Sequence, residues 1–98
     1  MSDDSPDRRP WIIEAEIMPR TGVNDPQGDA VMSGLHALGF VTAYGVRCGK
    51  VIRIETLASS VADAISQGRE MCERLLANPV IEQYEVSATV APAKRADS

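Results

Sequence analysis

Hydrophobic and polar residues alternate from Trp11 to Met18, which predicts a half-buried β-strand. One face of this strand collects the apolar residues Trp11, Ile13, Ala15 and Ile17. Glu14 and Glu16 lie on the opposite face, and Pro19 ends the strand because it lacks a backbone N–H. The segment is therefore expected to contribute one sheet face to the core.

Two later segments have the spacing of amphipathic helices. The first opens with Asp25 as N-cap and Pro26 at the first helical position, and Gly39 can close it in the left-handed conformation. Its apolar stripe consists of Val31, Leu35 and Leu38. The second helix is expected over residues 60–77, and Asn78-Pro79 ends it because a residue before proline avoids the helical region.

Three further segments predict strands over residues 40–48, 51–57 and 81–90. A two-residue hairpin at Gly49-Lys50 would place Arg47 opposite Ile52, with a charge on an apolar face. A loop of odd length or a bulge is therefore expected between the first two of these strands. The whole pattern predicts an α+β fold of order β-α-β-β-α-β, a two-layer sandwich with both helices on one face of an antiparallel sheet.

The chain has 98 residues, which suffice for one domain. The folded domain is expected at residues 11–90, with flexible tails at residues 1–10 and 91–98, because both ends are polar and lack periodicity. Aromatic residues make up only 4% of the chain, so aliphatic side chains must form the core. A domain this small buries a modest share of its surface, so it is expected either to be marginally stable alone or to be stabilised by a partner subunit.

The net charge of −4 argues against a nucleic-acid partner and against an anionic membrane surface. No apolar run approaches the roughly 20 residues that span a bilayer, and the acidic N-terminus is unlike a signal peptide. A cytoplasmic location is therefore expected. In that reducing compartment, Cys48 and Cys72 are expected to be free thiols, since they lack CxxC spacing.

No residue pattern indicates catalysis, cofactor binding or a metal site. His36 is the only histidine, and no serine or cysteine is an obvious partner for it in the sequence, which leaves pairing through the fold open. Glu14 and Glu16 are expected on a solvated strand face rather than as a catalytic pair. The segment from Gly45 to Lys50 leaves two interpretations open, a rigid turn with two exposed cations or a phosphate-binding loop that lacks the P-loop pattern. The chain is therefore expected to be a binding or assembly domain.

Three segments carry a specific signature when they are taken together. They are Asp25-Pro-Gln-Gly28, Val46-Arg-Cys-Gly-Lys50 and Met71-Cys-Glu-Arg-Leu-Leu-Ala-Asn-Pro-Val-Ile-Glu-Gln-Tyr84. In this order and at these distances, over residues 11–90, they resemble the PurS family, the small subunit of phosphoribosylformylglycinamidine (FGAM) synthase. The resemblance covers nearly the whole expected domain.

The resemblance implies a non-catalytic subunit of a three-part amidotransferase in purine (IMP) biosynthesis. In such a complex the glutaminase subunit PurQ releases ammonia from glutamine. The synthetase subunit PurL uses ATP and Mg to install that ammonia, which converts formylglycinamide ribonucleotide (FGAR) to FGAM. The PurS-like chain brings the two together without a cofactor of its own, and a dimer or a dimer of dimers is implied.

Exposed and conformationally restricted residues are the expected partner contacts. They are Asp25, Pro26, Gln27, Gly28, Arg47, Gly49, Lys50, Asn78 and Pro79. For the two proline dipeptides, a helix start and a helix stop are sufficient explanations, so a structural role stays open beside the contact role. The rival classes are a ligand-sensing module and an acylphosphatase-like hydrolase, and the hydrolase would need an arginine-bearing phosphate loop after the first strand.

Overall fold

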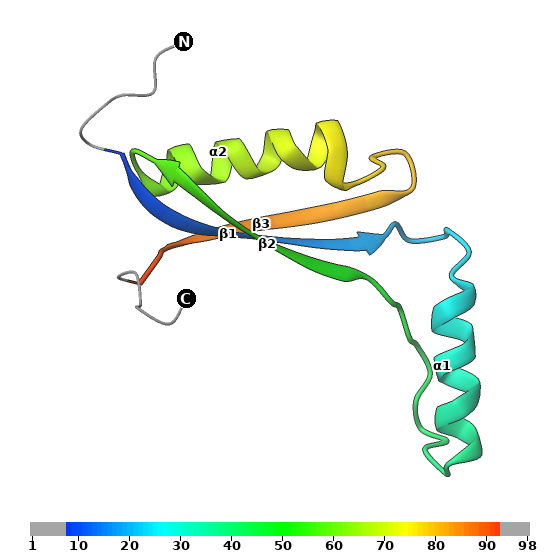
Figure 1. Ribbon diagram of the computed structural model, residues 1–98. Helices are drawn as coiled ribbons and strands as arrows, with labels where there is room; N and C mark the ends of the chain where they lie inside the picture. The colour runs from blue at the N-terminus through cyan, green and yellow to red at the C-terminus, as the bar shows by residue number, and fades with distance from the viewer. Residues whose placement is uncertain (1–7, 93–98) are drawn as a thin grey trace.

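The computed structural model describes residues 8–92. Its elements are β1 (Arg9–Pro19), α1 (Pro26–Ala37), β2 (Lys50–Ala58), α2 (Val61–Met71), the π-helical turn η1 (Cys72–Leu76) and β3 (Glu82–Val90). The three strands form an antiparallel sheet in the order β2-β1-β3, and α2 lies along one face of it (Figure 1). The α+β class and the antiparallel sheet expected from the sequence are confirmed.

The core lies between α2 and the central strand β1. The four apolar residues of the alternating pattern are buried as expected: Trp11, Ile13, Ala15 and Ile17. The Trp11 indole N–H donates a 3.1 Å hydrogen bond to the Ala58 carbonyl, so its polar group is satisfied. Gly68 allows α2 to approach closely, because an added Cβ would lie 2.7 Å from Val86 Cγ1 and 2.8 Å from Ile13 Cγ2.

The second helix begins and ends close to the expected positions. Ser60 is the N-cap, and its hydroxyl accepts a 3.0 Å hydrogen bond from the Asp63 N–H. The Asp63 carboxylate accepts from the Ser59 N–H at 3.0 Å, and this bond lowers the pKa of Asp63. The last turn widens to η1, where the Ala77 N–H bonds the Cys72 carbonyl at 3.0 Å.

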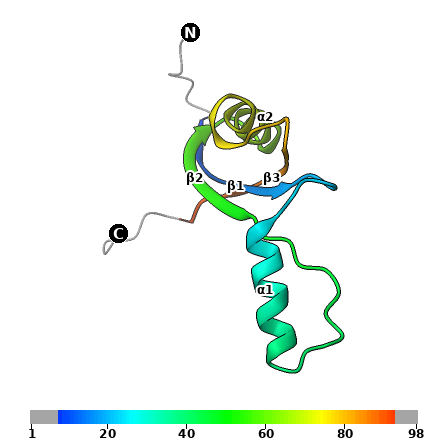
Figure 2. The same cartoon turned by 90° about the vertical axis from the view of Figure 1, so that its right-hand side faces the viewer.

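Helix α1 forms as predicted, with Asp25 as N-cap and Pro26 in its first turn, but its position corrects the expected architecture. It projects away from the sheet and makes no substantial contact with the sheet or with α2 (Figures 1 and 2). Two residues of its apolar stripe stay exposed, Val31 at 43% and Leu38 at 76%. Periodicity shows that a helix has an apolar stripe, but not which surface covers it. Only α2 therefore covers the sheet.

The strand predicted over residues 40–48 is absent from this structure. Instead, this segment runs back along α1, and we call residues 26–48 together the arm. Within the arm the Phe40 N–H bonds the Leu35 carbonyl at 2.9 Å, and His36 Nε2 lies 2.7 Å from the Ala43 carbonyl oxygen. Gly39 adopts the expected left-handed conformation, with φ +97°, at the reversal.

The expected hairpin of odd register is therefore wrong as well. Gly49 lies in no turn but directly before β2, and an added Cβ there would lie 2.3 Å from the Ile17 carbonyl oxygen. The chain passes directly beside β1 and enters β2 with Lys50 opposite Ile17. The predicted tails fall largely on residues 1–7 and 93–98, which lie outside the described residues. None of the helices within residues 8–92 is long and apolar enough to cross a bilayer.

Candidate functional site

The residues expected to contact a partner gather at one end of the sheet. Their three segments meet where β1 ends and where β2 and β3 begin (Figure 1). The Arg47 guanidinium donates to the carbonyl of Pro19, and Arg20 Nε donates to the carbonyl of Pro79 at 2.8 Å. Because both arginines are anchored at the end of β1, we call this region, residues 19–28, 46–50 and 78–79, the sheet-end site.

Asp25 holds the base of the arm closed. One carboxylate oxygen accepts from the Gly28 N–H and the other from the Cys48 N–H, each at 2.9 Å. These bonds, the one from Cys48 foremost, lower the pKa of Asp25 below its ordinary value of 3.8. The stabilisation is therefore fully present above pH 3.8 and is lost only as the pH falls through the lower pKa of the folded state.

Gly28 and Gly49 allow the backbone segments of the site to touch. Gly28 is buried, and an added Cβ would lie 2.5 Å from the Val46 carbonyl oxygen. A side chain at Gly49 would meet the Met18 sulfur and the Ile17 carbonyl oxygen. Both glycines therefore have a packing reason to be glycine.

The Asn78-Pro79 dipeptide follows the end of the second helix, as expected. It also forms a turn that is held by hydrogen bonds. The Asn78 side-chain oxygen accepts from the Val80 N–H at 3.2 Å, and the Asn78 N–H donates to the Glu82 carboxylate at 2.7 Å. The Pro79 carbonyl accepts a hydrogen bond from Arg20 Nε. This turn is consequently fixed from both ends.

The remaining expected contact residues are exposed at the sheet-end site. Pro26 and Gln27 lie on the first turn of α1, and Arg47 and Lys50 lie on either side of Gly49. The two cations are thus displayed on a backbone that Asp25 and Gly49 hold in place. This arrangement can recognise a partner surface.

The phosphate-loop interpretation of residues 45–50 is disfavoured by the position of Asp25. The Cys48 amide, which a phosphate would need, already donates to the Asp25 carboxylate. That negative charge also opposes an anion at the same place. The rigid-turn interpretation therefore accounts better for these residues.

Sequence reasoning did not identify Arg20 as a member of the site. It lies one residue beyond β1, and its backbone N–H donates to the Ile81 carbonyl at 2.9 Å while its side chain binds Pro79. These partners are about sixty residues away along the chain, so no local sequence signal could have identified the contact.

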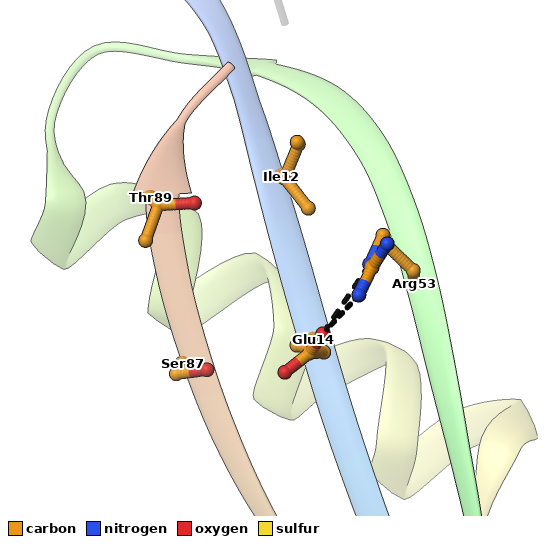
Figure 3. Close-up of a pocket in the computed structure, with 5 residues that line it drawn as sticks. All are labelled: Ile12, Glu14, Arg53, Ser87 and Thr89. Atoms are coloured by element: carbon orange, nitrogen blue, oxygen red, sulfur yellow. Dashed lines mark hydrogen bonds and ion pairs between the residues drawn. The ribbon is translucent and has the colours of Figure 1, made fainter. Parts of the chain in front are cut away.

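The face of the sheet opposite α2 carries a depression (Figure 3). It is lined by Ile12, Glu14, Arg53, Ser87 and Thr89. The Glu14 carboxylate is bound by Arg53, with Nη2 at 2.7 Å and Nε at 3.2 Å. Both side chains of this ion pair are exposed, 66% for Arg53 and 42% for Glu14, so the pair lies on the solvated strand face that the sequence predicts.

Metal and thiol chemistry find no support in the described part of the chain. No group of three or more His, Cys, Asp or Glu residues within positions 8–92 could hold a metal ion. Both cysteines are free, as predicted, with Cys48 half-buried and Cys72 buried. Burial raises the pKa of the Cys72 thiol, so it acts as a core residue.

Comparisons with known proteins agree on one family. Residues 12–90 match the family model PurS, described as phosphoribosylformylglycinamidine (FGAM) synthase. The chain is 43% identical over 75 residues to the FGAM synthase subunit PurS of Archaeoglobus fulgidus, covering 76% of this chain and 94% of that protein.

Solved structures give the same result for the fold. PurS of Methanocaldococcus jannaschii, one of the subunits of formylglycinamide ribonucleotide amidotransferase, superposes with a TM-score of 0.74 at 30% identity, covering 84% of this chain and 99% of that one. A chain in the structure of PurLQS from Thermotoga maritima gives a TM-score of 0.73 at 30% identity, covering 82% and 98%.

Proposed function

Because this chain belongs to the PurS family, we propose that it is the small, non-catalytic subunit that bridges the glutaminase and synthetase subunits of FGAM synthase. The observation that carries this proposal is the match over residues 12–90, which spans every strand and helix except the first three residues of β1. The sheet-end site supports it, because its polar groups are used to hold shape rather than to perform chemistry. The chain thus serves purine (IMP) biosynthesis as part of a complex.

In this proposal the chemistry resides in the partners. PurQ releases ammonia from glutamine, and PurL uses ATP and Mg to convert FGAR to FGAM, while this chain binds no cofactor itself. We place the complex in the cytoplasm, where both free thiols suit a reducing compartment. A subunit that holds two others together needs exposed side chains on a backbone that does not move. The sheet-end site has such side chains.

Omitting this chain is expected to abolish glutamine-dependent FGAM formation by a mixture of the two large subunits. The physical reason is that ammonia released by an undocked glutaminase is diluted before it reaches the synthetase. Activity is measured as FGAM formed from FGAR, ATP and glutamine. Supplying a high concentration of ammonium salt bypasses the bridge and is expected to restore turnover, which serves as the control. Equal glutamine-dependent rates with and without this chain would contradict the proposal.

We further propose that two copies of the chain associate through their arms. The radius of gyration is 17.9 Å, whereas a compact chain of this length has about 13 Å. The arm is the reason, and it exposes Val31, Leu38, Phe40, Val41 and Tyr44. An apolar surface of this extent on an outstretched element is typical of a subunit interface, and a second copy supplies the same apolar surface in return.

The double variant Phe40→Ser/Val41→Ser is expected to weaken self-association at least about tenfold. These side chains are 58% and 73% exposed in the single chain, so the substitutions remove apolar contacts that form only in the dimer. Sedimentation equilibrium at several concentrations measures the effect. Val90→Ser, which changes a 55% exposed valine at the far end of the sheet, is the matched control and should leave the mass unchanged. An unaltered dimer in the arm variant would exclude this interface.

A further inference from the structure

A cluster of exposed aliphatic side chains lies at the turn between η1 and β3. Leu75 is 83% exposed, Val80 81% and Ile81 44%, and we call residues 75–81 the knob. The knob connects η1 to the start of β3 and includes the Asn78-Pro79 turn of the sheet-end site (Figure 1). A single exposed leucine is ordinary on a protein surface, so its exposure alone does not indicate a function.

The backbone of the knob is held unusually firmly for an exposed apolar turn. The Asn78 carbonyl accepts from the N–H groups of Ile81 at 3.0 Å and Glu82 at 2.7 Å. The Asn78 and Glu82 side chains tie the same turn from within. Arg20, just beyond the end of β1, donates to the Pro79 carbonyl through its side chain and to the Ile81 carbonyl through its backbone N–H. A turn that is ordered before its partner arrives loses little conformational entropy on binding.

The charges around the knob leave a cation displayed beside the aliphatic side chains. Its neighbouring carboxylates are engaged internally, Glu70 by Arg74 at 3.1 Å and Glu73 by the Tyr84 hydroxyl. Arg20 Nε donates a hydrogen bond to the Pro79 carbonyl. The two Nη groups of Arg20 make no hydrogen bond or ion pair with any residue from 8 to 92. The knob thus presents apolar groups and free guanidinium donors together.

We propose that the knob docks into an apolar pocket with carboxylates at its rim on a larger, non-identical subunit of the complex, an inference that rests on the function proposed above. Leu75 and Val80 would fill the pocket, and Arg20 would pair with the acidic rim. A few aliphatic side chains are enough for a binding hot spot but too few for an obligate dimer interface. A two-fold contact between two knobs would also bring Arg20 against its own copy, and like charges repel.

The double variant Leu75→Ser/Val80→Ser tests this inference. Its affinity for the purified synthetase subunit and for the purified glutaminase subunit is measured separately, and binding to at least one of them should weaken about tenfold or more. Val61→Ser is the matched control, because this valine is 47% exposed at the opposite end of α2 and is expected to leave both affinities unchanged. The single variant Val80→Ser repeats the comparison without altering η1, should the double variant lose stability.

Two results would overturn the inference while leaving the proposed function intact. One is unchanged affinity of the folded double variant for both large subunits. The other is loss of self-association, measured by sedimentation, with affinity for the large subunits retained, which would assign the knob to the contact between copies. If the unmodified chain binds neither large subunit, the proposed function fails and this inference fails with it.

Discussion

Gly68→Val is expected to destabilise the folded chain by about 3 kcal/mol. The Cβ alone would lie 2.7 Å from Val86 Cγ1 and 2.8 Å from Ile13 Cγ2, and the two further methyl groups of valine add to this overlap. Ile13 is fully buried in the central strand, so neither the strand nor the helix can move aside without opening the core. Chemical denaturation at a fixed protein concentration measures the loss.

The control for Gly68→Val is Ser66→Val in the same helix. Ser66 is exposed, and serine and valine have similar helix propensities, so this variant should change the free energy of unfolding by less than about 0.5 kcal/mol. If both variants were equally stable, α2 would not rest on the sheet through Gly68. For a domain of this size, a loss of about 3 kcal/mol removes a large part of the total stability.

Gly28→Val is expected to open the base of the arm at a cost of about 2 kcal/mol. The new Cβ would lie 2.5 Å from the Val46 carbonyl oxygen and 2.6 Å from the Asp25 carboxylate. The hydrogen bond from the Cys48 N–H to Asp25 would break as the two segments separate. Amide hydrogen exchange at Cys48 should therefore accelerate roughly 30-fold, while exchange in the middle of β1 stays unchanged.

Gly34→Ala in the same helix is the control for the arm. Nothing lies within 4 Å of an added Cβ at Gly34, and alanine favours the helix over glycine by about 1 kcal/mol. Exchange at Cys48 should thus be unchanged or slower in this variant. The same rate in both variants would mean that the contact between Gly28 and Val46 does not hold the arm closed.

Local features of the fold were predictable because their causes lie within a few residues. The alternation along Trp11 to Ile17 placed one face of β1 in the core. The caps Asp25 and Ser60 make the hydrogen bonds to the residues three positions later that their types predict. The reversal at Gly39 likewise follows from the conformational freedom of glycine.

The meaning of Gly49 could not be read from its neighbours. A Gly-Lys pair between two apolar segments resembles a connection between neighbouring strands, and a loop of odd length or a bulge was expected there. In the structure, Gly49 is required for contact with the β1 backbone at Ile17. A turn glycine and a close-approach glycine have the same local sequence, and only the position of a distant segment distinguishes them.

The sequence by itself determined the caps, the central strand and the amphipathic second helix, since these follow from residue types and short spacings. Only the tertiary structure decided that α1 stands away from the sheet, that Asp25 binds Cys48 and that Arg20 ties the turn at Pro79. These contacts join residues 23 and 59 positions apart. Such pairings depend on how the whole chain folds back on itself, and no periodicity within one segment encodes them.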